Sequence, residues 1–142
     1  MKPSRTYIDH TADILFKAEA PTLEELFVQC ALALEESQVE INLIEKKEEL
    51  TITGKEKTLE RLLFNFLDDL VFHKDSDLLI FNDFSLNIKK DNDEYHLTCL
   101  ARGEKIDHAK HEPKVDVKAI TMHMFYVKEI ENGWEAQVLI DI

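Results

Sequence analysis

The spacing of apolar and polar residues predicts a strand and then a helix near the start of the chain. From Asp13, apolar and polar residues alternate until Pro21, as in a strand with one buried face. Thr22-Leu23-Glu24-Glu25 follows with the spacing of a helix capping box. Leucines and aromatic residues then recur at helical spacing, so a first helix is expected through about residue 36.

The next segment predicts one more strand and a second helix. Apolar and β-branched residues before Gly54 indicate a strand over residues 47–53. Over residues 57–73, leucines and phenylalanines form a wide apolar stripe, with Thr58 as the expected cap. Such a stripe is typical of a helix that faces the core, so we assign it no ligand role.

From residue 84 onward the alternation has a period of two, as in two β-hairpins. The expected strands are residues 84–88, 95–101, 115–127 and 134–140. A polar turn at residues 90–93 joins the first pair, and Glu131-Asn132-Gly133, where Asn-Gly can supply positive φ angles, joins the second. The order β-α-β-α-β-β-β-β predicts an α+β fold with two helices packed on a largely antiparallel β-sheet. At this length, residues 1–142 are expected to form a single domain.

Composition favours a soluble, cytoplasmic protein. The apolar runs are shorter than the roughly 18 to 20 residues that span a bilayer, and the first residues lack a signal-peptide pattern, so no membrane association is expected. The net charge of −12 would repel a phosphate backbone. Direct RNA binding is therefore not expected as the main activity, and a cation or a basic protein partner is favoured. Cys30 and Cys99 lack metal-site spacing and are expected to be buried, reduced thiols.

Two aspartates near the ends of the chain form the first candidate site. Asp13 falls on the opposite face from the apolar residues of its strand, and Asp141 alternates with Ile140 and Ile142. If the first and last strands are neighbours, both carboxylates and the α-carboxylate of Ile142 could converge, and these anions would then raise one another's pKa values or require a cation. These hard oxygen donors suit Ca²⁺ or Mg²⁺. On spacing alone, the same aspartates also fit ordinary capped or solvated strand ends.

The stretch from Arg102 to Lys118 is a second candidate, because it gathers five cations in an otherwise acidic chain. They are Arg102, Lys105, Lys110, Lys114 and Lys118. An anion would be favoured here, although the charges could equally pair with carboxylates. His108, His111 and His123 in and after this stretch do not have the spacing of a zinc site.

Several segments, taken in order, resemble the archease family. They are Asp9-His10-Thr11-Ala12-Asp13-Ile14, Thr22-Leu23-Glu24-Glu25-Leu26-Phe27, Ala101-Arg102-Gly103-Glu104, His111-Glu112-Pro113-Lys114, Val117-Lys118-Ala119-Ile120-Thr121 and Asp141-Ile142. No single motif is decisive, but their order and spacing cover the whole chain. Leu15 and Ala20 stand where relatives commonly have glycines. Met122 stands where a tyrosine often precedes the histidine matching His123, which leaves any role of His123 open.

The resemblance implies a non-catalytic protein that activates the RNA ligase RtcB in tRNA splicing. Archeases promote guanylylation of this ligase and its multiple turnover, using a bound divalent cation. The implied metal ligands are Asp13, Asp141 and the main-chain oxygens of Ile142. Ca²⁺ is the expected ion, with Mg²⁺ or Mn²⁺ as alternatives. The implied partner contacts are Lys118, as an anion contact, together with His10 and His111.

Two other functions fit the same residues. One is a metal-dependent phosphoester hydrolase, with the carboxylates holding Mg²⁺ and a histidine acting as base, although the chain has no Walker loop and no two-metal ligand set. The other is a general chaperone-like adaptor, which would need only an exposed apolar patch. Co-purification separates the three, because an activator predicts one ligase partner, a hydrolase predicts activity alone, and an adaptor predicts a mixture of clients.

Overall fold

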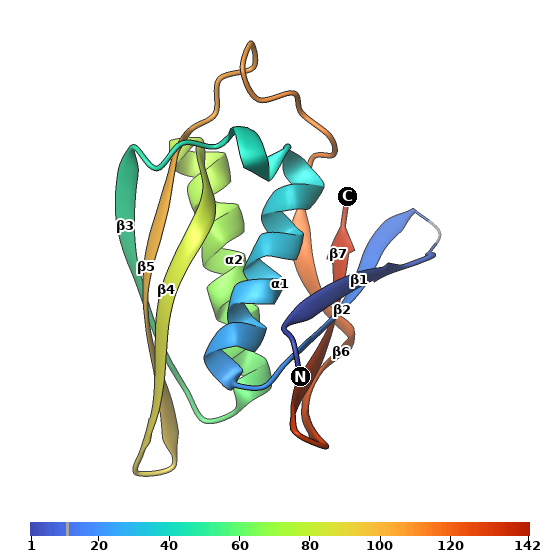
Figure 1. Ribbon diagram of the computed structural model, residues 1–142, viewed down its shortest axis with the longest axis vertical. Helices are drawn as coiled ribbons and strands as arrows, with labels where there is room; N and C mark the ends of the chain where they lie inside the picture. The colour runs from blue at the N-terminus through green and yellow to red at the C-terminus, as the bar shows by residue number, and fades with distance from the viewer. Residues whose placement is uncertain (11) are drawn as a thin grey trace.

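Two helices lie between two antiparallel β-sheets in the computed structural model, which describes residues 1–10 and 12–142 (Figure 1). The motif residue Thr11 lies outside the described residues. The four-stranded sheet contains, in spatial order, β1 (Ser4–Ile8), β2 (Asp13–Ala20), β7 (Gly133–Asp141) and β6 (Ala119–Ile130). The three-stranded sheet contains β3 (Glu48–Glu56), β5 (Glu94–Lys105) and β4 (Leu79–Asp91). The helical segments are α1 (Leu23–Gln38), the short 3₁₀ turn η1 (Ile41–Leu43) and α2 (Leu59–Asp77).

The predicted fold class is confirmed, and the predicted order of elements holds from β2 onward. The structure differs in two respects: it adds β1 before the first predicted strand, and it divides the strands between two sheets instead of one. Each sheet turns one apolar face towards the helices, so the alternation within a strand is the same whether its partners lie in one sheet or in two. Strand β1 is largely exposed and carries no clear alternation.

Both helices begin at the predicted caps. The Thr22 hydroxyl accepts from the N–H of Glu25 at 3.2 Å and donates to the Glu25 carboxylate at 2.9 Å. The Thr58 hydroxyl accepts from the N–H of Arg61 at 3.2 Å. These bonds satisfy N–H groups that have no partner within the first turn of a helix. The caps therefore fix where each apolar stripe starts along the sheets.

The core fills the space between the two sheets, and aromatic residues from both helices and β4 pack at its centre. Phe66 of α2 stacks against Phe27 of α1 and meets Phe84 of β4 edge to face. Cys30 and Cys99 are free thiols buried in this core, as predicted. Among the residues that the structure describes, no helix is long and apolar enough to cross a membrane.

The turn of the second hairpin ends one residue earlier than predicted. Ile130 pairs with Gly133, so the turn is Glu131-Asn132, and Asn132 supplies the positive φ of 66°. Gly133 already belongs to β7. A side chain there would place its Cβ 2.3 Å from the carbonyl oxygen of Ala20. Close approach of two strands, and not a positive φ angle, therefore requires the glycine.

Candidate functional site

Asp13 and Asp141 face each other directly across the β2–β7 pair. Opposite residues of antiparallel strands share one face of the sheet, with Cβ atoms about 4.5 to 5.5 Å apart. The neighbouring pair, Ile14 and Ile140, packs into the core on the other face. The alternation of each strand predicts the face on which each aspartate lies, and the register meets the condition that the first and last predicted strands be neighbours. Two carboxylates thus share one end of the four-stranded sheet.

Lys118 lies beside this pair through its backbone. Its N–H donates to the main-chain oxygen of Asp141 at 2.9 Å, and the next residue, Ala119, pairs with Asp141 in the sheet. The Lys118 side chain is exposed. The structure therefore brings the last lysine of the basic stretch to the sheet end that carries both aspartates.

His10 lies between β1 and β2 and contacts the same end of the sheet. Its Nδ1 is 3.7 Å from Oδ2 of Asp13, and both side chains are partly exposed. Ala12, between them in sequence, has a φ of 66°, in the left-handed region that residues with a side chain seldom adopt. This conformation costs about 1 kcal/mol. The sharp turn at Ala12 thus leads directly into Asp13, with His10 close to its carboxylate.

The oxygen donors at this end of the sheet fit a hard divalent cation. Asp13 and Asp141 supply two carboxylates on one face, and the main-chain oxygens of Ile142 follow directly after Asp141. Ca²⁺ and Mg²⁺ prefer such oxygen ligands. Across residues 1–10 and 12–142, no group of three or more His, Cys, Asp or Glu side chains is gathered to hold a metal. A cation here would therefore need main-chain oxygens or water to complete its coordination.

The side chain of His111 is fully buried. Its Nδ1 accepts from the N–H of Asp107 at 2.9 Å, and its Nε2 lies 2.9 Å from Oε2 of Glu104. Because Nδ1 accepts, Nε2 carries the proton and donates it to the carboxylate. This placement corrects the expectation of a direct partner contact by His111, since its side chain does not reach the surface. Its two hydrogen bonds fasten the loop over residues 106–118.

Glu104 is the common acceptor that holds this loop. Its Oε2 accepts from the N–H of Glu45 at 2.7 Å and from Lys110 Nζ at 2.8 Å, besides His111. Burial raises the pKa of Glu104, but the hydrogen bonds from Lys110, the Glu45 N–H and His111 outweigh it and lower the pKa to about 2. Glu104 therefore stays ionised and ties the start of the loop to the three-stranded sheet, while the loop's last residue, Lys118, contacts the four-stranded sheet.

Most of the basic stretch is engaged in ion pairs. Arg102 Nη1 lies 2.6 Å from Asp83 Oδ2, and its Nε lies 3.3 Å from Glu49 Oε1. Lys110 pairs with Glu104, and Lys114 lies 4.0 Å from a carboxylate oxygen of Glu40. The pairing carboxylates come largely from distant elements, which explains why the local sequence suggests a free positive surface. The structure thus supports pairing within the chain for these three cations.

A wide bulge in β6 has no counterpart in the sequence prediction. Residues 122–125 oppose only Val138 of β7, and Met124 has a φ of 59°. The side chains of Met122 and Met124 are 44% and 43% exposed. The sequence does carry a signal, because the apolar positions change from even numbers at Met122 and Met124 to odd numbers at Phe125 and beyond. Such a change of phase within a strand is what an inserted bulge produces.

An apolar row adjoins the aspartate pair on the outer face of the four-stranded sheet. Ile8, Leu15 and Leu139 are consecutive cross-strand partners, two residues along from Asp13 and Asp141. Leu15 and Leu139 are each only 4% exposed, although they lie outside the core between the sheets. The acidic end of the sheet therefore has an apolar border.

These features define a small α+β domain with an acidic sheet end and two helices between antiparallel sheets. The solution structure of protein 1598 from Methanobacterium thermoautotrophicum has the same architecture, with a TM-score of 0.87 and 34% sequence identity, covering 97% of this chain and 98% of that one. The profile of the Archease protein family matches residues 6–142. The chain belongs to the archease family.

Curated relatives agree with this assignment over nearly their full length. The archease of Pyrococcus abyssi is 42% identical over 137 residues, covering 96% of both chains. That of Methanothermobacter thermautotrophicus is 35% identical over 136 residues, again covering 96% of both. A crystal structure from Thermotoga maritima, described as an archease and possible chaperone, shares the fold with a TM-score of 0.63 at 22% identity, covering 95% of this chain and 94% of that one.

Proposed function

We propose that this protein is a non-catalytic activator of an RtcB-type RNA ligase, promoting guanylylation and multiple turnover of the ligase in tRNA splicing. The observation that carries the proposal is the register that sets Asp13 opposite Asp141, with the N–H of Lys118 bound to the main-chain oxygen of Asp141. Three motifs distant in the sequence thereby contribute to one end of one sheet. Membership of the archease family supports the same function.

A divalent cation completes the proposed site. Asp13, Asp141 and the main-chain oxygens of Ile142 would hold Ca²⁺, with Mg²⁺ or Mn²⁺ as alternatives. The bound ion would supply positive charge between the two carboxylates. His10 would keep the Asp13 carboxylate oriented towards it, as polar neighbours of metal ligands commonly do.

Lys118 would contact an anionic group of the ligase or its nucleotide beside the cation. The remainder of the surface favours a basic protein partner, because the net charge of −12 attracts positive surfaces and speeds encounter with them. The free thiols of Cys30 and Cys99 fit action in a reducing compartment such as the cytoplasm.

Ligase guanylylation by GTP tests the site directly. The wild-type protein should stimulate formation of the ligase–GMP adduct, and Asp13→Ala and Asp141→Ala should each lose most of the stimulation. Asp68→Ala is a matched control, because Asp68 is an exposed aspartate on α2, away from the sheet end. Equal stimulation by all four proteins would refute the site, and absence of stimulation by the wild type would refute the proposed function.

A chaperone-like adaptor is the second candidate, favoured by the exposed methionines of the β6 bulge. Met122 and Met124 offer polarisable, adaptable side chains of the kind found at binding surfaces for many partners. Affinity purification distinguishes the two functions. An activator should retain one ligase in a fixed ratio, whereas an adaptor should retain a mixture of unfolded or aggregation-prone proteins.

A further inference from the structure

Strand β4 has a long free edge on the side that faces away from its partner β5. It contains 13 residues and, among residues 1–10 and 12–142, pairs only with β5, so one row of its backbone groups has no strand of this part of the chain beside it. Helix α1 lies along this edge and satisfies it at two points. Glu35 accepts from the N–H of Phe81 at 2.6 Å, and Glu24 accepts from the N–H of Ile88 at 3.3 Å.

Between these two points, in the part of the chain that the structure describes, no side chain or loop bonds the N–H of Phe84 or Leu86. Hydrogen-bonded and non-hydrogen-bonded pairs alternate along an antiparallel ladder. Since the N–H of Ile88 points towards α1, the N–H groups of Leu86 and Phe84, two and four residues back, point the same way. The bulge between Phe81 and Asp83 explains why Phe81 also faces α1 despite its odd number. The Phe84 and Leu86 backbone groups are therefore available to an added strand.

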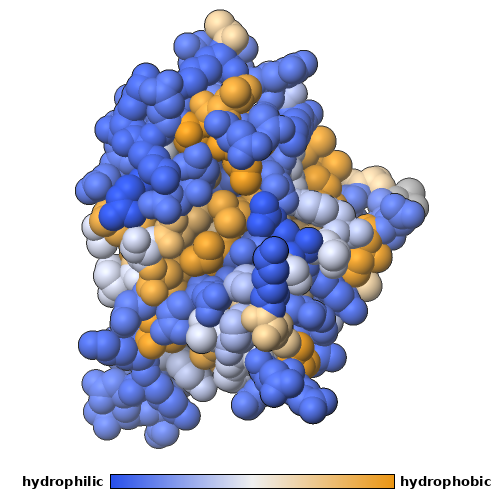
Figure 2. Space-filling model, in the orientation of Figure 1, coloured by the Kyte–Doolittle hydropathy of each residue, from blue (hydrophilic) through white to orange (hydrophobic). Residues whose placement is uncertain are grey.

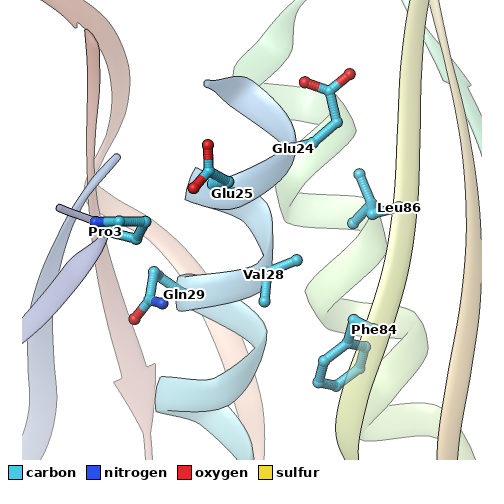
Figure 3. A pocket seen from close by; sticks show the side chains of 7 residues that line it. All are labelled: Pro3, Glu24, Glu25, Val28, Gln29, Phe84 and Leu86. Carbon is cyan, nitrogen blue, oxygen red and sulfur yellow. The ribbon is translucent and has the colours of Figure 1, made fainter. Parts of the chain in front are cut away.

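A groove of about 350 Å³ lies directly in front of these two residues. Val28, Phe84 and Leu86 line its apolar side next to β4, and Glu24 extends towards β4 from the first turn of α1 (Figure 3). Pro3, Glu25 and Gln29 line the side away from β4. The space-filling view shows apolar side chains gathered between β4 and α1 on this face (Figure 2). We call these seven residues the α1–β4 groove.

We propose that the α1–β4 groove binds a short extended segment of a protein partner, in which an apolar residue is flanked by lysine or arginine. The apolar side chain would enter between Val28 and Leu86. The segment's backbone would bond the free edge at Phe84 and Leu86, in the way that edge strands accept an extra strand. The groove belongs to the edge of the three-stranded sheet, so this contact is separate from the aspartate pair on the four-stranded sheet.

The charge at the groove selects a basic segment. Glu24 and Glu25 are adjacent, and the carboxylate of Glu25 accepts a hydrogen bond from the Thr22 hydroxyl, a neutral donor. The whole chain carries a net charge of −12, so an acidic segment would be repelled before it reached the edge. A basic residue on one side of the apolar anchor would meet Glu24, which also accepts from the N–H of Ile88, and one on the other side would meet Glu25.

Titration of the ¹⁵N-labelled protein with the capped peptide Lys-Leu-Lys-Val-Lys-Leu-Lys tests the proposal. The amide signals of Phe84 and Leu86 should shift, and their hydrogen exchange should slow at least tenfold at saturation. A peptide with serine in place of leucine and valine keeps the charge but lacks the anchor, so it should bind at least tenfold more weakly. A Val28→Lys variant should lose at least tenfold in affinity for the first peptide.

Phe72→Lys provides the matched control, because Phe72 is an exposed apolar residue on α2 outside the groove. It adds the same charge and should leave the affinity unchanged. Glu25→Gln, at the partly exposed rim, keeps an acceptor for the Thr22 hydroxyl and removes the charge, so it should weaken binding without disturbing the fold. Equal binding of the two peptides, equal affinity of the Val28 and Phe72 variants, or shifts confined to other amides would overturn the proposal. Concentration-dependent shifts of Phe84 and Leu86 without peptide would instead assign the groove to a second copy of this chain and overturn it too.

Discussion

Replacing Glu104 by glutamine should release the loop over residues 106–118 from the three-stranded sheet. The substitution keeps the shape of the side chain but removes its charge. Three donors now converge on one carboxylate oxygen: the Glu45 N–H, Lys110 Nζ and His111 Nε2. An uncharged amide oxygen in that position can accept from at most two of them, and the NH₂ group would face Lys47 Nζ, which lies 3.7 Å from Oε1.

The pKa of Glu104 gives the size of the effect. A fall from 4.5 to about 2 corresponds to about 3 kcal/mol of preferential stabilisation of the charged form. The neighbouring Lys47 and Glu45 are each 60% exposed, so solvent screens part of this energy. We therefore expect Glu104→Gln to lower the free energy of unfolding by about 2 kcal/mol, or roughly 5 to 8 °C in Tm for a chain of this length.

The pH dependence provides a second measure of the same substitution. The folded-state pKa of Glu104 is lowered, so its stabilisation is complete above the unfolded value of 4.5 and is lost as the pH falls towards about 2. Wild-type protein should therefore lose more stability between pH 5 and pH 3 than the Glu104→Gln variant. Urea unfolding followed by circular dichroism at both pH values measures the difference.

Glu45→Gln is the control, because Glu45 also pairs with Lys110 but is exposed. It should change stability little. If Glu104→Gln proved as stable as the wild type, or if both proteins lost equal stability on acidification, the network at Glu104 would not be what holds the loop. If the loop does hold Lys118 in place, Glu104→Gln should also reduce stimulation of the ligase while leaving both aspartates unchanged.

Two further substitutions test the core and the close contact of the three-stranded sheet. Burial raises the pKa of Glu35 to about 8, so the folded state retains a proton that the unfolded state releases above 4.5, and wild-type stability should fall as the pH rises between these values. Glu35→Gln can still accept from the Phe81 N–H, and urea unfolding at pH 5 and pH 8 should show a smaller decline than in the wild type. Gly103→Ala would bring a Cβ to 1.8 Å from the Ile80 carbonyl oxygen. It should lower the free energy of unfolding, measured by thermal unfolding, by about 1 to 3 kcal/mol or more. At Gly54, where the nearest atom is 3.4 Å away, alanine should be tolerated, and equal losses at both glycines would contradict the proposed clash.

The sequence predicts the elements that bury one face each, because their apolar spacing is repeated over many residues. Both helix caps are correct, since Thr22 and Thr58 act on N–H groups only three residues away. Strand β1 is missed because an exposed edge strand has no buried face to impose a pattern. The division into two sheets depends on contacts between distant segments, which no local spacing records.

The same distinction applies to the candidate site. The alternation around Asp13 and Asp141 places both on the outer face, because a strand has a fixed period of two. Their direct opposition depends on the register of β2 with β7, which only the structure supplies. The burial of His111 depends on Glu104, seven residues away, and on Asp107. A motif match locates such a residue in the chain but does not say whether its side chain faces solvent.

The four-stranded sheet is built from the two ends of the chain, with the three-stranded sheet formed by the segment between them. During synthesis, residues 48–105 can pair with one another before β6 and β7 have left the ribosome. Strand β2 cannot pair with β7 until then. Pairing across so long a separation is slow, because closing a long loop costs conformational entropy before the new contacts can offset it. The aspartate pair should therefore be among the last features to form, and a prematurely terminated chain that ends before Asp141 would lack it. Folding order thus ties the proposed activity to the synthesis of β7, which carries Asp141.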